Sequence, residues 1–292
     1  MKTILVPTDF SQPAENAARY AIQLAGGLIT NIKLVNAFKV PAEAPMAAKV
    51  VWPLEDYSSL KNDITGELAL LADRLINEEK TKLSQQAYHP LIEYTCGVGS
   101  LTEVVRNLTN EQKYAMLVMG MSGAGGLSNF FWGSNSREMI EKANFPVLLI
   151  PAETTFNGIS KIAFASDLGN DDIHAIHCLA GLARKFNAEI QVVHITDEKY
   201  DEVEHQEKTD AFLDHIKARI DYPKIYYRHV KSINVGHGLD WLTEHGQVEM
   251  VAMVHRHHNI FDQIFSGSHT QRLARHIDLP LLAFPAGYRA VV

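Results

Sequence analysis

The chain has 292 residues and a net charge of −7, with 46% hydrophobic and 21% charged residues. This length suits two domains of ordinary size, and the composition is that of a globular protein without a bias toward disorder. The acidic balance argues against nucleic-acid binding, and no apolar stretch has the length of a membrane span or the pattern of a signal peptide, so we expect a cytoplasmic protein.

The N-terminal segment predicts a strand at residues 4–7 followed by a helix. Ser11 is placed to cap this helix, and Pro13 lies in its first turn, where the missing N–H costs nothing. Small and apolar residues then recur at helical spacing from Ala14 to Ala25. Further strands, with helices between them, are expected near residues 32–38, 91–96, 115–120 and 146–150. This alternation predicts an α/β fold with helices on both faces of a parallel sheet.

Residues 39–55 are rich in Pro and Ala and have no counterpart later in the chain, so we interpret them as an insertion after the second strand. In parallel sheets, ligands bind beyond the carboxyl ends of the strands, where the strand order reverses. Within the insertion, Trp52 and the stretch Met46–Val51 are candidates for a flap near the first pocket or for a contact with the other half of the chain, and the sequence does not choose between these. The insertion is also a candidate surface for a homodimer.

The fourth strand runs into a loop with glycine at positions 120, 123, 125, 126 and 133. Glycine lets backbone N–H groups approach a ligand closely. The helix that follows opens with Ser134, Asn135 and Ser136, and free N–H groups at a helix start suit a phosphate. These features predict a phosphate-binding loop. It lacks the lysine of a Walker motif, and it does not follow the first strand as a dinucleotide fingerprint does.

Three segments of the first half return in the second half in the same order. Residues 2–11, KTILVPTDFS, return as SKIAFASDLG; residues 31–38, NIKLVNAF, return as EIQVVHIT; and WGSNSREMIEKANFPVLLIP returns as SGSHTQRLARHIDLPLLAFP. The repeats predict two tandem domains, residues 1–151 and 160–292. Strands of the second domain are expected near residues 161–166, 190–195, 224–229, 249–254 and 280–284.

The spacing Gly120-x2-Gly123-x9-Gly133-Ser134 resembles the nucleotide motif of the universal stress protein family, in its ATP-binding class. The segments LVPTDFS and FPVLLIP resemble the first and last strands of the family. The resemblance covers both halves of the chain. It implies two Rossmann-like domains, each with a five-stranded parallel sheet of strand order 3-2-1-4-5.

The same resemblance implies a site for ATP, with or without Mg²⁺, in the first domain. It places Asp9 at the ribose or adenine side, although Asp9 also suits an acidic cap for the helix at Ser11. It places Pro7, Ala37 and Met119 around the adenine. The remaining predicted nucleotide-binding residues are Thr8, Gly120, Ser122, Gly123, Gly133, Ser134, Asn135 and Ser136.

The second half departs from this motif. When the two Gly-Ser pairs are aligned, Gly120 falls on Val254 and Gly123 on His257, so we expect weak or no ATP binding there. Thirteen of the 14 histidines lie in this half. Imidazoles and a carboxylate suit zinc, and the candidate ligands are Asp167, His194, His255 and His257. The alternative is that these side chains face solvent, cap helices or pack beside the sheet.

Three functions remain open from the sequence. The first is an ATP-binding regulatory protein of the stress-response type, in which nucleotide occupancy changes conformation or partners. The second is a weak ATPase or a phosphotransferase, although no general base or pair of Mg²⁺-binding carboxylates stands beside the glycine loop. The third is an interaction module that does not use a nucleotide.

The final apolar strand of each half predicts how the halves associate. In the order 3-2-1-4-5 the fifth strand is an edge, and an exposed apolar edge invites further pairing. We therefore expect the two fifth strands, within VLLIP and LLAFP, to lie side by side in an intramolecular pseudo-dimer.

Overall fold

The computed structural model describes residues 3–39, 54–82, 88–121, 134–196, 202–232, 235–256 and 279–289. Within these ranges most strands are followed by a helix, and the chain divides into two compact units, residues 1–120 and 121–292. The fold class is confirmed: each unit has a mostly parallel sheet with helices packed on it. No helix in these ranges has an apolar stretch long enough to span a bilayer.

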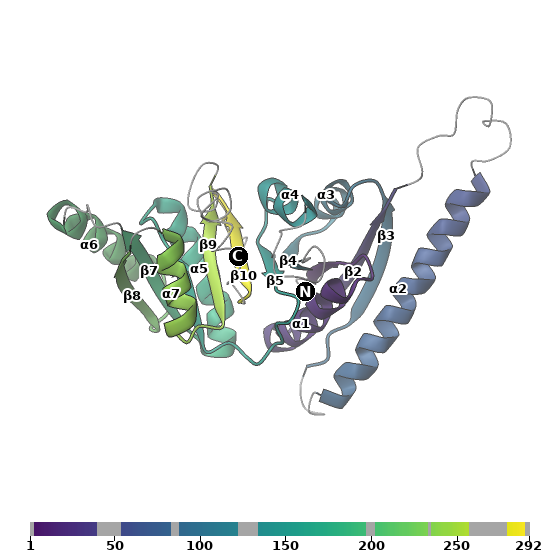
Figure 1. The fold of residues 1–292 in the computed structure, drawn as a ribbon, viewed down its shortest axis with the longest axis horizontal. Coiled ribbons are helices and arrows are strands. Elements are labelled where there is room, and N and C mark those ends of the chain that lie inside the picture. Colours follow the sequence, from purple (N-terminus) through teal and green to yellow (C-terminus); the bar gives the residue numbers. More distant parts are fainter. Residues whose placement is uncertain are drawn as a thin grey trace, which may run out of the picture. The chain divides into compact units, whose positions relative to one another are not determined.

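The first unit contains four parallel strands in the order β3-β2-β1-β4 (Figure 1). The strands are β1 (Thr3–Pro7), β2 (Asn31–Phe38), β3 (Ile92–Val98) and β4 (Tyr114–Gly120). The helices are α1 (Gln12–Leu28), α2 (Leu54–Lys82) and α3 (Leu101–Glu111). Figure 1 shows α1 and α3 on opposite sides of the strands. Ile4, Leu5 and Val6 are fully buried, as expected for a strand covered on both faces.

Helix α1 begins as the sequence predicts. The Ser11 hydroxyl accepts a hydrogen bond from the Ala14 N–H at 3.4 Å, and a proline lies in the first turn. Its alanine-rich face is buried against β1 and β4, including Ala17, Ala18 and Ala21. The helix ends where Ile29 adopts a left-handed conformation, with φ of 56°. These small side chains let the helix lie close to the sheet.

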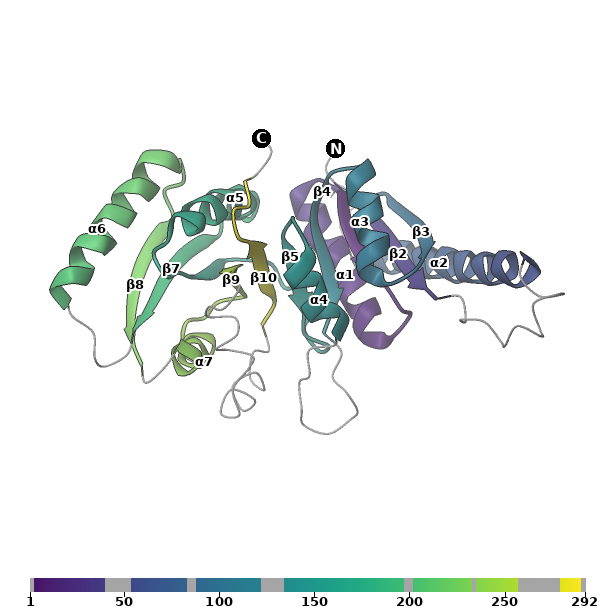
Figure 2. The same ribbon diagram turned by 90° about the horizontal axis from the view of Figure 1, so that it is seen from above.

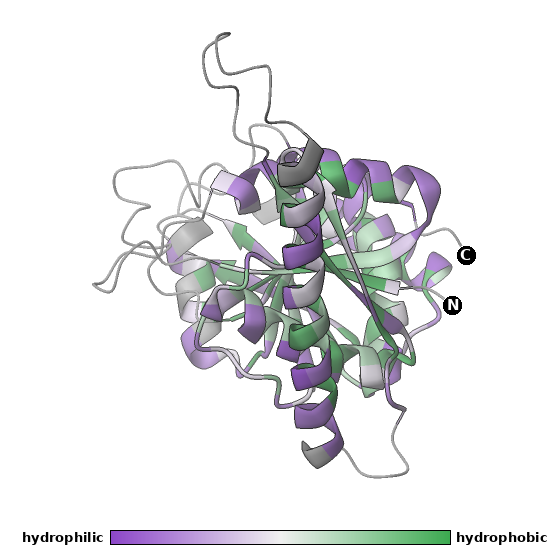
Figure 3. Ribbon diagram, turned by 90° about the vertical axis from the view of Figure 1, so that its right-hand side faces the viewer, coloured by the Kyte–Doolittle hydropathy of each residue, from purple (hydrophilic) through white to green (hydrophobic). Residues whose placement is uncertain are grey.

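Helix α2 packs on β3 and contributes Leu68, Leu71 and Leu75 to the core. Hydrophilic and hydrophobic positions alternate along it in Figure 3, where it faces the viewer. Its polar side meets α1 through ion pairs, in which Glu78 binds Arg19 at 2.7 Å and Arg74 binds Glu15 at 2.7 Å. Both faces of the helix therefore contribute to its position on the first unit.

The second unit contains the parallel strands β10-β9-β6-β7-β8 in that order, and β5 pairs antiparallel with β10. Its strands are β5 (Val147–Ile150), β6 (Lys161–Ala165), β7 (Glu189–Thr196), β8 (Ile225–Lys231), β9 (Met250–His255) and β10 (Leu281–Pro285). Its helices are α4 (Ser134–Lys142), α5 (Asn170–Phe186), α6 (Glu202–Arg219) and α7 (Val235–His245). In Figure 2, α5 and α6 lie on one face of the sheet and α7 on the other.

The pairing of β5 with β10 brings two apolar strands together, with Leu148 opposite Leu282 and Leu149 opposite Leu281. All four leucines are at most 1% exposed. This pairing accounts for the grouping of α4 and β5 with the second unit. It also satisfies backbone groups that an open edge would leave without partners.

Candidate functional site

The carboxyl end of β1 is held in place by hydrogen bonds to the end of β2. The Thr8 N–H donates to the Val35 carbonyl at 2.9 Å, and the buried Asn36 amide donates to the Thr8 carbonyl at 2.8 Å. The Thr8 hydroxyl accepts from the Phe10 N–H at 3.0 Å. Phe10 has a φ of 62°, so the chain turns sharply here before α1 begins. This network fixes the direction in which the intervening residue projects.

That residue is Asp9, which is exposed to solvent. Its Oδ1 accepts hydrogen bonds from the Ser11 N–H at 3.0 Å and from the Ser11 hydroxyl at 2.5 Å. Asp9 therefore binds Ser11, the residue that caps α1. The sequence predicts Asp9 as an acidic cap of this helix, and in the structure it acts on the cap through Ser11. In the part of the chain that the structure describes, no basic side chain pairs with its carboxylate.

The other predicted adenine contacts lie on the same edge of the first unit. Pro7 ends β1 and is buried, Ala37 is half-buried near the end of β2, and Met119 is buried in β4. Gly120 ends β4 beside the first turn of α1, where an added Cβ would lie 2.4 Å from the Pro13 carbonyl oxygen. The sequence predicts that this glycine lets a ligand approach, and the close contact with α1 is a second, structural reason for a glycine here.

The predicted phosphate-binding residues are only partly described. Ser134, Asn135 and Ser136 form the first turn of α4, as expected; the first two are exposed and Ser136 is buried. Ser122, Gly123 and Gly133 lie outside the described residues. The structure therefore does not test their assignment to the phosphates.

The second repeat, residues 160–292, builds the same turn after β6. The Ser166 hydroxyl accepts from the Leu168 N–H at 2.9 Å, and Asp167 Oδ1 accepts from the Gly169 N–H at 3.0 Å. Leu168 has the same φ, 62°, as Phe10. His194 takes the place of Asn36, because its Nδ1 lies 2.9 Å from the Ser166 carbonyl. The two turns thus share their backbone and its hydrogen bonds.

The two turns differ in their electrostatics, because Arg256 binds the carboxylates of the second. This arginine follows β9 and donates to Asp167 Oδ2 at 2.5 Å and to Asp172 Oδ1 at 2.7 Å, and its Nε lies 3.9 Å from Asp171. Asp172, on the first turn of α5, also accepts from the Ser166 hydroxyl at 2.6 Å. The carboxylate of Asp167 is therefore already paired with a cation of the same chain.

Asp172 is 1% exposed, and burial raises its pKa to about 6. The neighbouring Asp167 carboxylate acts in the same direction, whereas Arg256 and the Ser166 hydroxyl lower the pKa. Sequence reasoning missed both Arg256 and Asp172. The signal was a basic residue directly after the fourth strand of the second repeat, together with two acidic residues in the first turn of α5.

Two of the four candidate zinc ligands form other interactions in the structure. Asp167 is bound to Arg256, and His194 bonds to the Ser166 carbonyl. His255 is buried at the end of β9, and His257 lies outside the described residues. Across the described ranges, no group of three or more His, Cys, Asp or Glu side chains is arranged so that it could hold a metal ion.

Comparison with known proteins assigns both repeats to one family. The model of the Universal stress protein family matches residues 1–151 and 158–285. Universal stress protein MJ0577 of Methanocaldococcus jannaschii is 28% identical over 167 residues, an alignment that covers 51% of this chain and 94% of that protein.

Solved structures show the same fold over nearly all of the chain. A universal stress protein from Archaeoglobus fulgidus DSM 4304 superposes with a TM-score of 0.69 at 13% identity, covering 98% of both chains. A structure from Pseudomonas aeruginosa UCBPP-PA14 superposes with a TM-score of 0.57 at 13% identity, covering 98% of this chain and 94% of the other. At these identities the likeness concerns the fold alone.

Proposed function

Because the chain belongs to the universal stress protein family, we propose that its first repeat, residues 1–151, binds ATP and that nucleotide occupancy regulates its conformation or its partners. The glycine spacing from Gly120 to Ser134 supports the proposal, since it matches the ATP-binding class of the family. The second repeat, residues 160–292, does not bind ATP in this proposal. The chain is then a regulator with one nucleotide site.

The residues at the end of β1 and β2 fit the adenosine part of the nucleotide. Asp9 is exposed, and its Oδ1 is already oriented by Ser11, so the carboxylate suits ribose hydroxyl groups. Ala37 has a small side chain where the second repeat has Ile195, which leaves more room for a flat base. Backbone N–H groups of the glycine loop and of the start of α4 would hold the phosphates. Any Mg²⁺ would be bound by the phosphate oxygens.

The contrast between Asp9 and Asp167 carries the proposal. The two aspartates occupy equivalent turns with equivalent hydrogen bonds. Asp167 is neutralised by Arg256, whereas Asp9 is exposed and has no basic partner in the described ranges. A ligand hydroxyl therefore meets an available acceptor in the first repeat and an engaged one in the second.

Calorimetric titration of the whole chain with Mg-ATP tests this assignment. We expect one site per chain, and Asp9→Asn should weaken binding about tenfold or more because a charge-assisted hydrogen bond is lost. Asp167→Asn is the matched control in the equivalent turn and should leave the affinity unchanged. Two equal sites, or equal losses in the two variants, would contradict the proposal.

The regulatory part of the proposal needs a separate measurement. Hydrogen exchange of the full chain with and without Mg-ATP should show protection beyond the end of β1 and the glycine loop, because a regulatory ligand must favour one conformation. Asp9→Asn at the same ATP concentration provides the control. Protection confined to the contact residues would leave a binding protein without a conformational response.

We further infer that the two repeats associate as a pseudo-dimer through β5 and β10. The antiparallel pairing of Leu148 with Leu282 and of Leu149 with Leu281 supports this arrangement. It buries two apolar edges that each repeat would otherwise expose. Most of the insertion at residues 39–55 falls outside the described residues, and it remains our candidate surface for a homodimer.

A further inference from the structure

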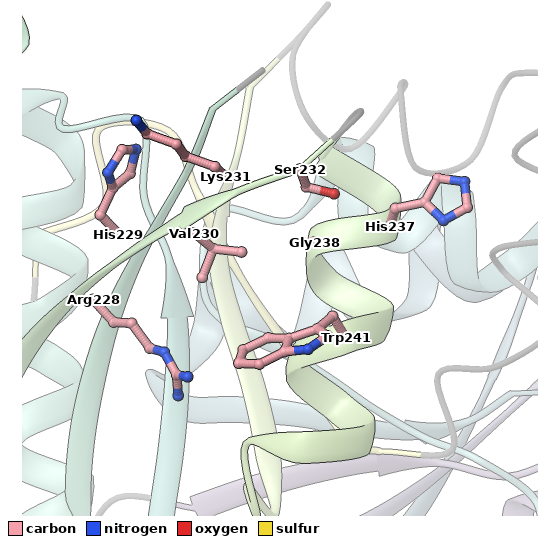
Figure 4. A pocket seen from close by; sticks show the side chains of 8 residues that line it. All are labelled: Arg228, His229, Val230, Lys231, Ser232, His237, Gly238 and Trp241. Atoms are coloured by element: carbon pink, nitrogen blue, oxygen red, sulfur yellow. The ribbon is translucent and has the colours of Figure 1, made fainter. Parts of the chain in front are cut away.

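A pocket lies between β8 and α7, and the strand β7 separates β8 from β6, the strand that precedes the turn at Asp167. It has a volume of about 360 Å³, within the range of small-molecule sites. Figure 4 shows the residues that surround it. The lining residues that bear on its chemistry are Arg228, His229, Lys231, His237, Gly238 and Trp241.

Arg228 is held at the wall of this pocket by an aromatic side chain. Its guanidinium carbon lies 4.6 Å from the centre of the Trp241 ring, and His245 stacks on the same tryptophan at 5.3 Å. Figure 4 shows Arg228 and Val230 directed to the side of Trp241, with His229 and Lys231 on the other side of the strand. No carboxylate in the described ranges forms an ion pair with Arg228. Stacking fixes the guanidinium while its N–H edges keep their donor capacity.

The charge of the pocket is opposite to that of the whole chain. Arg228 is a cation that faces Trp241, whereas Lys231 and His229 border the pocket from the other side of β8. None of the lining residues is acidic, although the chain carries a net charge of −7. A concave surface with this balance attracts an anion and repels a cation.

The first repeat serves as an internal comparison, because the positions equivalent to Arg228 and Trp241 carry other residue types there. Thr95 pairs with Val35 as Arg228 pairs with Val193, so Thr95 stands where the second repeat has Arg228. Both α3 and α7 have 11 residues, and the seventh is Asn107 in α3 and Trp241 in α7. The stacked cation is therefore a feature of the second repeat alone.

The contact between the helix and the neighbouring strand beside the pocket differs in side-chain volume between the repeats. In the first, Val104 fills the space in front of Gly97, where an added Cβ would lie 2.8 Å from its Cγ1. In the second, the fourth residue of the helix is Gly238, and an added Cβ there would lie 2.6 Å from Cγ2 of Ile195. The bulk thus moves from helix to strand, and α7 has no side chain at the wall of the pocket at this position.

The geometry points to a second ligand site in this protein: the pocket between β8 and α7 binds a small phosphorylated molecule, with its phosphate at Arg228. The planar guanidinium matches phosphate oxygens in a bidentate manner. The positive charge and the fork of N–H donors of Arg228 favour a phosphate dianion over a single carboxylate. This site is separate from the proposed ATP site and does not depend on it.

The test uses the whole chain labelled with ¹⁵N at the indoles of its three tryptophans, and inorganic pyrophosphate as the probe. The Trp241 signal is identified by its absence in Trp241→Phe. At pH 6.5 pyrophosphate should shift this signal saturably, and Arg228→Gln should weaken the response at least tenfold. Arg228→Lys, which keeps the charge but loses the fork, should give an intermediate loss.

Two controls show whether the response arises in this pocket. Arg106→Gln removes an exposed arginine from α3 of the first repeat and should change nothing at Trp241. Asp9→Asn should leave the shift intact, because the ATP site is elsewhere. The proposal is overturned if millimolar pyrophosphate leaves Trp241 unmoved, if Arg228→Gln responds like the unaltered chain, or if citrate binds as tightly as pyrophosphate.

Discussion

Equivalent aspartates can acquire different roles through a single neighbouring side chain. Asp9 and Asp167 lie two residues after corresponding strands, and each accepts a hydrogen bond from the backbone N–H two positions later. Arg256 then distinguishes them, because it binds Asp167 together with the buried Asp172. Such a buried ion pair costs desolvation energy, and removal of one partner leaves the other charge uncompensated.

The raised pKa of Asp172 predicts a specific dependence of stability on pH. Its value of about 6 lies above the ordinary value of about 4, so the folded chain holds this proton more tightly than the unfolded chain does. This group therefore adds stability as the pH falls from above 6 toward 4, and that contribution is lost as the pH rises through 6. Asp172→Asn should remove this part of the pH dependence.

Urea unfolding at several pH values between 7.5 and 4.5 provides the measurement. Asp171→Asn is the control, because Asp171 lies 3.9 Å from Arg256 but its side chain is 38% exposed. If both variants keep the slope of the unaltered chain, Asp172 is not the group that titrates. The charged groups that act on the pKa of Asp172 are Asp167, in the turn after β6, and Arg256, which follows β9.

At the scale of elements, the close contact between β4 and α1 predicts a cost for any side chain at residue 120. An added Cβ would lie 2.4 Å from the Pro13 carbonyl oxygen, and the backbone cannot give way as a flexible side chain does. Gly120→Ala should therefore destabilise the chain by about 1–3 kcal/mol. Gly181→Ala in α5 meets no atom within 4 Å and should instead stabilise the protein by about 0.5–1 kcal/mol.

Chemical denaturation of Gly120→Ala and Gly181→Ala measures the free energy of unfolding of each variant and shows whether the contact with α1 or the loss of a glycine as such determines stability. The two substitutions are identical in chemistry, so opposite signs are expected only if the contact with α1 decides the outcome. A Gly120→Ala variant with unaltered stability but weaker ATP binding would assign this glycine to the ligand rather than to the helix contact.

The alternation of strands and helices was predictable because hydrophobic periodicity and capping are local properties of the sequence. Ser11 at the start of α1 and Ser134 at the start of α4 both begin their helices as expected. The pairing of Arg256 with Asp172 was not predictable in this way, since 84 residues separate them and their meeting depends on the fold. The pocket beside Trp241 likewise joins residues of β8 and α7, and their meeting depends on the fold.

At the scale of the whole molecule, the pairing of β5 with β10 predicts the behaviour of a fragment. Residues 1–151 alone would keep Leu148 and Leu149 without the leucines of β10 that cover them. We expect this fragment to self-associate through β5, and sedimentation at tens of micromolar measures it. Leu148→Arg in the fragment should restore a monomer, because a charge on this edge opposes pairing. A stable monomer without that substitution would mean that another surface joins the repeats.

The ion pair of Arg256 with Asp167 also shapes the dose response of the chain. A tandem protein with two working sites fills in two steps, and coupling between them gives a sigmoidal or biphasic curve. In this chain the carboxylates of the second turn, Asp167 and Asp172, are paired with Arg256 of the chain itself. With ATP bound only in the first repeat, as proposed, occupancy follows a simple hyperbola with one midpoint. Such a chain reports nucleotide concentration as a graded signal and not as a threshold.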